Sequence, residues 1–145
     1  MIDRPRRNRL TKGIRNLVSE TTVQPRNLVW PAFVQEGRNQ RTPIVSMPGI
    51  SRLSIDQLVA DSKKAFDLGV PAVALFPAID DSLKNSEGKE SLNPDGLLQR
   101  AVKELKQQVP ELVVISDVAL DPYSSDGHDG LVQDGQILND ETLPL

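Results

Sequence analysis

The stretch "SIDQLVADSKKAFDLGVPAVALFPAIDD", residues 54–81, contains the pattern that decides the fold class. We predict a helix that begins after Ser54, with Gln57 as its capping-box partner, and that ends at Gly69. One face of this helix carries apolar side chains at helical spacing: Ile55, Leu58, Val59, Ala65 and Phe66. Residues 70–76 then form an apolar run that is typical of a strand buried in a parallel sheet. A helix leading into such a strand is one repeat of an α/β fold.

The sequence before this stretch predicts another strand and a long loop. Residues 28–34 are mostly apolar, and Pro31 within them cannot donate a ladder hydrogen bond, which indicates an edge-like, interrupted or bulged strand. Residues 35–52, "QEGRNQRTPIVSMPGISR", are rich in Gly, Pro and polar side chains and predict a long loop. Long loops in compact domains are often functional.

The sequence after it repeats the alternation once more. We predict a second helix with Asn93 as N-cap and Pro94 at the first helical position, ending before Pro110. Its inward face is Leu97, Leu98, Ala101, Val102 and Leu105. Residues 112–115 predict a third strand. Three such units indicate either an open α/β sheet or part of a (β/α)8 barrel, and both place their chemistry at the carboxyl ends of the strands.

Length and composition indicate a single soluble domain. The chain has 145 residues, of which 38% are hydrophobic and 26% charged, with a net charge of -3. No apolar run approaches the roughly 20 residues of a membrane span, so we expect no membrane partner. The absence of cysteine excludes disulfides and thiolate metal sites, which fits a reducing, cytoplasmic compartment.

Residues 1–26 form a basic amino-terminal arm. Its basic side chains are Arg4, Arg6, Arg7, Arg9, Lys12, Arg15 and Arg26. The arm lacks the apolar segment of a secretory signal. It also lacks the interleaved aromatic side chains that favour nucleic-acid binding, so we expect no nucleic-acid partner. A solvated arm or a contact between subunits accounts for it.

The Asp loop, residues 116–130, "SDVALDPYSSDGHDG", directly follows the third predicted strand. It holds the only histidine and four aspartates: Asp117, Asp121, Asp126, His128 and Asp129. These oxygen ligands and the imidazole suit Mg²⁺, Mn²⁺ or Ca²⁺. Crowded carboxylates also serve in acid/base catalysis, because each raises the pKa of the others. The third interpretation is a solvated loop of ordinary turn-forming residues.

Six motifs in order resemble the porphobilinogen synthase family, also called 5-aminolevulinate dehydratase. They are "RPRRNR", "NLVWPAFVQEG", "MPGISRLS", "ALFPAIDD", "NPDGLLQRAVKELK" and "SDVALDPYSSDGHDG" followed by "NDET". The resemblance implies the amino-terminal portion of a TIM (β/α)8 barrel with an extended arm. It also implies a lyase (hydro-lyase) of tetrapyrrole biosynthesis, including haem and chlorophyll. This enzyme condenses two 5-aminolevulinate molecules into porphobilinogen with loss of two waters. Members assemble as homo-oligomers, typically octamers, clasped by their arms.

The resemblance also implies roles for individual residues. The zinc-dependent branch has cysteines where this chain has Ala119, Asp121 and Asp129, so no catalytic zinc is expected. The pattern is similar to the plant, algal and cyanobacterial branch, which is associated with Mg²⁺. The implied catalytic residues are Asp117, Asp121 and Asp129, and the implied metal ligands are Asp121, Asp129 and His128.

The chain departs from the family pattern in its extent. It shows three of eight β/α units: an arm over 1–26, and an incomplete barrel over 27–145 that includes the Asp loop. The two lysines to which the family tethers its substrates match no position here. We therefore expect the 145 residues alone to be inactive, with an uncovered apolar sheet face and an unpaired edge. A non-catalytic subunit that assembles with full-length enzyme is the alternative. A small cation-binding α/β domain is a third hypothesis, and the plastid stroma is the alternative location.

Overall fold

A five-stranded sheet organises the protein, whose computed structural model describes residues 4–145. The strand order is β2-β3-β1-β4-β5. The strands are β1 (Val29–Val34), β2 (Arg41–Pro43), β3 (Ser51–Leu53), β4 (Ala72–Pro77) and β5 (Val113–Ser116). Strands β3, β1, β4 and β5 run parallel, and β2 is antiparallel to β3. The α/β prediction is confirmed, and the described residues contain no closed barrel.

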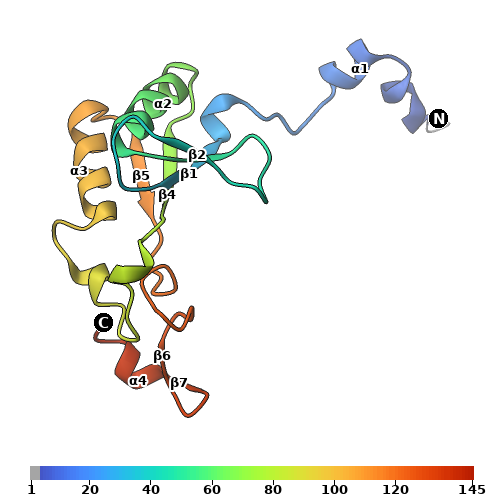
Figure 1. The fold of residues 1–145 in the computed structure, drawn as a ribbon. Helices are drawn as coiled ribbons and strands as arrows, with labels where there is room; N and C mark the ends of the chain where they lie inside the picture. Colours follow the sequence, from blue (N-terminus) through green and yellow to red (C-terminus); the bar gives the residue numbers. More distant parts are fainter. Residues whose placement is uncertain (1–3) are drawn as a thin grey trace.

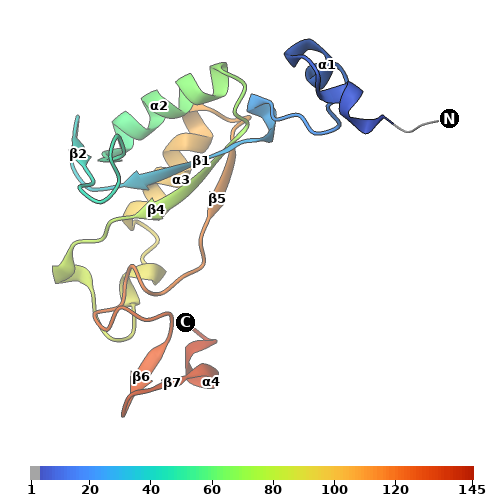
Figure 2. The same ribbon diagram turned by 90° about the vertical axis from the view of Figure 1, so that its right-hand side faces the viewer.

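Two helices, α2 (Ile55–Asp67) and α3 (Leu97–Gln108), cover one face of this sheet (Figures 1 and 2). The side chains of Val34, Leu58, Leu75 and Leu105 are fully buried between the helices and the strands. Both predicted apolar helix faces point inward, as their spacing required. Burial of these side chains is the main stabilising contribution to the layer.

Helix α2 begins directly after Ser54, as predicted, but its capping and the start of α3 differ from the predictions. Ser54 precedes α2 but caps nothing, because its hydroxyl accepts the Gln40 N–H at 2.9 Å and donates to the Asp56 carboxylate at 2.6 Å. The capping-box prediction is therefore wrong. Helix α3 begins after Gly96, one turn later than predicted, because Asn93 forms a turn whose side-chain oxygen accepts the Asp95 N–H at 3.0 Å.

The predicted long loop over 35–52 contains β2 and β3, which form an antiparallel pair. Strands of three residues are too short for an alternation of apolar and polar side chains to distinguish them from a loop. Strand β1 lies in the middle of the sheet, yet at Pro31 itself it is edge-like, as the sequence predicted. Proline is tolerated there because β3 pairs with β1 only at Phe33 and Val34, so that Pro31 has a neighbouring strand on one side alone.

The opposite face of the sheet is open. Val113 and Ile115 on β5 are 53% and 43% exposed, and β5 is an edge strand. Phe33 and Phe76 lie on the same face, with ring centroids 5.6 Å apart. On β5 only Val114, on the helix side, is half-buried, so the predicted uncovered face and unpaired edge are confirmed for residues 4–145.

Shorter elements flank the sheet. The arm contains a 3₁₀ turn, η1 (Pro5–Arg9), and α1 (Lys12–Leu17), and it extends away from the sheet (Figures 1 and 2). Further 3₁₀ turns are η2 (Pro25–Asn27), η3 (Asp81–Leu83) and η4 (Lys89–Leu92). The carboxyl end forms the hairpin β6 (Leu131–Gln133) and β7 (Gln136–Leu138), followed by α4 (Asn139–Thr142). None of the helices in the described residues has the length and apolarity needed to cross a bilayer.

Candidate functional site

Two loops meet at the carboxyl ends of the parallel strands. The β4 loop, residues 78–96, follows β4, and the Asp loop, residues 116–130, begins at the end of β5. Asn85 and Ser124 form a parallel β-bridge that joins the two loops. Strands of a parallel sheet end at a common edge, and this edge is where α/β proteins place their ligands. The Asp loop therefore occupies the position that the sequence predicts.

Asp121 and Asp129 lie side by side within the Asp loop. One carboxylate oxygen of Asp129 accepts the Leu120 N–H at 2.9 Å and the Asp121 N–H at 3.0 Å. Partial burial raises the pKa of Asp121, and the neighbouring charges of Asp129 and Asp117 raise it further. Burial and the neighbouring carboxylates thus make Asp121 easier to protonate than an ordinary aspartate.

The other two predicted site residues are Asp126 and His128. Both are exposed, as are the other three aspartates, and the Asp126 N–H donates to the Ser124 hydroxyl at 3.1 Å. Among residues 4–145, no three His, Asp or Glu side chains gather into a group that could hold a metal ion. The fold thus brings Asp117, Asp121 and Asp129 near one another.

A cavity of about 410 Å³ adjoins the carboxylates on the open face of the sheet. Phe33 and Phe76 form its apolar side, and Arg52, Asp117 and Asp121 contribute the charged side. The two phenylalanines and Arg52 were not among the site residues predicted from the sequence. The alternation along β1 and β4 could have identified Phe33 and Phe76, since both fall on the face opposite Val34 and Leu75.

Comparison with known proteins assigns the family. The family model described as delta-aminolevulinic acid dehydratase matches residues 2–145. The chain belongs to this family. It is 49% identical over 142 residues to the dehydratase of Bradyrhizobium diazoefficiens, covering 98% of this chain and 40% of the relative. It is 52% identical to the chloroplastic dehydratase of Selaginella martensii, covering 99% of this chain and 34% of the relative.

A solved dehydratase has nearly the same fold over this region. The crystal structure of the delta-aminolevulinic acid dehydratase (porphobilinogen synthase) from Toxoplasma gondii ME49, in complex with the reaction product porphobilinogen, superposes with a TM-score of 0.93 at 47% identity. The match covers 99% of this chain and 41% of that one. The chain therefore spans about two fifths or less of the length of these relatives. It forms the amino-terminal part of the dehydratase barrel, as the resemblance implied.

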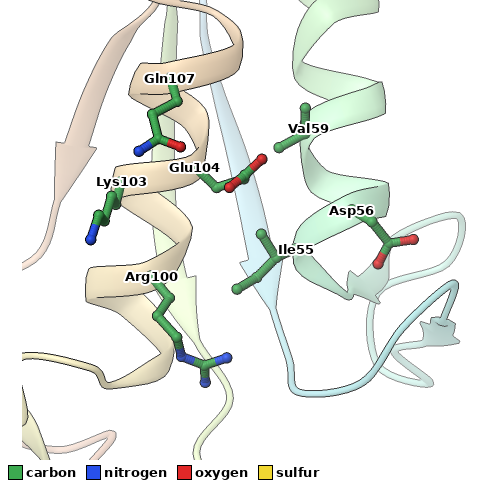
Figure 3. Close-up of a pocket in the computed structure, with 7 residues that line it drawn as sticks. All are labelled: Ile55, Asp56, Val59, Arg100, Lys103, Glu104 and Gln107. Atoms are coloured by element: carbon green, nitrogen blue, oxygen red, sulfur yellow. The ribbon is translucent and has the colours of Figure 1, made fainter.

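A second hollow, about 520 Å³, lies between α2 and α3 on the covered side of the sheet (Figure 3). Ile55 and Val59 form its apolar floor, and the Glu104 side chain points toward them from α3, while Lys103 points away (Figure 3). This groove is lined by residues of α2 and α3 and by none of the loops that follow β4 and β5, and its two carboxylates, Asp56 and Glu104, come from different helices. We therefore place the candidate site at the Asp loop.

Proposed function

We propose that this chain is the amino-terminal part of a porphobilinogen synthase, which condenses two 5-aminolevulinate molecules into porphobilinogen with loss of two waters. The observation that carries the proposal is the match of almost the whole chain, at a TM-score of 0.93, to a synthase in complex with its product. In support, the Asp loop lies at the edge of the sheet where barrel enzymes hold their substrates.

The three carboxylates supply proton transfer in this proposal. Loss of two waters and closure of the product ring require protons to be delivered to and removed from the substrates. Asp121, whose pKa is raised by burial and by the charges of Asp129 and Asp117, is suited to exchange a proton closer to neutral pH than an ordinary aspartate. We assign Asp117 and Asp129 to the same site because they face Asp121, and the Phe33 and Phe76 rings would exclude water beside it.

We propose Mg²⁺ as the metal, held by Asp121 and Asp129. The donor chemistry fits, since Mg²⁺ is commonly bound through one or two carboxylates and keeps several waters. One Asp129 oxygen is engaged by two backbone N–H groups, which leaves the other oxygen to a cation. We assign His128 to the same ion on the resemblance alone. When bound, the ion would supply positive charge to the cluster, and no zinc is expected because thiolates are absent.

Mg²⁺ binding is testable without activity. Titration with MgCl₂, followed by calorimetry and thermal unfolding, should raise the melting temperature of the wild-type chain and of a Ser86→Ala control. The variants Asp121→Asn and Asp129→Asn should lose the shift. A shift that persists in both variants, or that Zn²⁺ produces at lower concentration than Mg²⁺, contradicts this assignment.

Catalysis by the whole enzyme is testable by complementation. The 145-residue chain should form no porphobilinogen by itself, because no lysine in it matches the family's substrate-binding lysines. Mixing it with a second chain that carries the remaining barrel of the Selaginella martensii dehydratase should yield product. A mixture that copurifies and yields none contradicts the proposed function.

The second candidate function is a non-catalytic subunit that assembles with full-length enzyme through the arm. The exposure of Leu10 at 72% and Leu17 at 84% on the extended arm favours such a contact. Residues 4–18 contain six basic and no acidic side chains, while the rest of the chain is acidic on balance. Native mass spectrometry of a mixture with full-length enzyme should show this chain within the enzyme's oligomers, which are octamers in the family, and Leu10→Ser with Leu17→Ser should prevent its incorporation. We place the protein in the cytoplasm or the plastid stroma, since several relatives are named chloroplastic.

A further inference from the structure

We infer that Asn85, in the β4 loop, is a positioning residue that fixes the geometry of the Asp121–Asp129 pair in the Asp loop. The inference rests on the proposed function, which assigns proton transfer and cation binding to the Asp121–Asp129 pair. Asn85 itself has no contact with either carboxylate in the hydrogen bonds of residues 4–145. It acts through the backbone of the Asp loop.

The backbone of Asn85 holds the middle of the Asp loop from both sides. Its N–H donates to the Tyr123 carbonyl at 3.3 Å, and its carbonyl accepts the Ser125 N–H at 3.0 Å. Tyr123 and Ser124 are buried, with 5% and 4% of their surface exposed. An attachment made in a buried segment, where few waters can replace a lost bond, limits movement of the loop.

The side chain of Asn85 keeps its own backbone in place. Its Oδ1 accepts the Glu87 N–H at 3.0 Å and the Lys89 N–H at 3.2 Å, which closes a tight turn. Gly88 lies in this turn with φ of +60°, and a Cβ there would come within 3.1 Å of a Leu120 methyl group. The turn therefore packs against Leu120 as well as bonding to the loop beyond it.

Hydrogen bonds within the Asp loop connect the segment held by Asn85 to the carboxylates. The Tyr123 and Ser124 N–H groups both donate to the Leu120 carbonyl at 2.9 Å, which makes residues 120–124 one compact turn. Leu120 and Asp121, at the start of this turn, donate their N–H groups to Asp129. Displacement of the turn would thus move Asp121 away from Asp129.

Amide hydrogen exchange of the full chain, measured by NMR, tests the inference. Asn85→Ala should speed exchange of the Ser125 and Asp121 amides by about tenfold, as expected for loss of the bonds that hold one turn. Asn85→Asp, which keeps an accepting oxygen, should restore slow exchange. The control Asn93→Ala removes an equivalent turn bond in the same loop, to Asp95, and should change neither amide.

Two outcomes overturn the inference. One is that the Glu87 and Lys89 amides become exposed in Asn85→Ala while Asp121 exchanges as in the wild type. The other is that Asn85→Asp fails to restore protection. If Asn85→Ala unfolds, as judged by the Leu75 amide in β4, Gly88→Ala tests the same coupling by pushing the turn against Leu120. Exchange requires neither Mg²⁺ nor 5-aminolevulinate, so failure here is distinguishable from failure of the proposed function.

Discussion

The two faces of the sheet should differ sharply in their contribution to stability. Leu75 on β4 is fully buried under the helices, whereas Ile115 on the adjacent strand β5 is 43% exposed on the open face. Substitution by alanine removes the same number of carbon atoms at both positions. Leu75→Ala should cost about 3–5 kcal/mol, since it leaves a closed cavity. Ile115→Ala should cost about 1 kcal/mol, because only part of the side chain is buried and no cavity forms.

Urea unfolding followed by circular dichroism measures both values. With a slope of about 2 kcal/mol per molar urea, Leu75→Ala should lower the midpoint by about 1.5–2.5 M and Ile115→Ala by about 0.5 M. Equal losses would refute the reasoning, because they would mean that the open face is covered in solution. Repeating the unfolding at tenfold lower protein concentration then tests whether a second copy provides the cover.

Two further predictions concern carboxylates. The hydrogen bond from Arg41 lowers the pKa of Asp61, so the pair stabilises the fold above the unfolded pKa of about 3.9 and loses this contribution as pH falls. Arg41→Gln should therefore cost up to about 1 kcal/mol at pH 7 and almost nothing in strong acid, as urea midpoints at both pH values will show. Asp129→Asn should lower the pKa of Asp121 toward its ordinary value, since it removes a negative charge but not the burial. Carbon NMR titration of the Asp121 carboxyl checks this, and an unchanged or higher pKa would contradict the contact with Asp129.

The elements that could be predicted from the sequence are those whose apolar pattern continues over many residues. The helices α2 and α3 and the strand β4 were recognisable because their apolar side chains recur over at least six residues and meet a single buried layer. Strands β2, β3, β6 and β7 have three residues each, which is too short to show a recognisable alternation of apolar and polar side chains. The Asp134–Gly135 turn, with both residues at positive φ, was the one signal for β6–β7.

The candidate site was predicted in part, for a similar reason. Residues close in sequence, such as Asp121 and Asp129, fall in one loop whose position follows from the preceding strand. The roles of Ser54 and Asn85 depend on bonds to segments 14 and 38–40 residues away, so local sequence cannot show them. Ser54 has the sequence context of a helix cap, yet its hydroxyl accepts the N–H of Gln40, which is distant in sequence.

We propose that these residues supply the carboxylates of the site and none of its substrate-binding lysines. Incubation of the 145-residue chain with 5-aminolevulinate, reduction with borohydride and intact-mass measurement tests this most directly. Reduction of a Schiff base would fix the substrate covalently on a lysine. We predict an unmodified mass. A chain that gains the mass of one reduced substrate adduct would show that a lysine within these residues is reactive, and would contradict the claim.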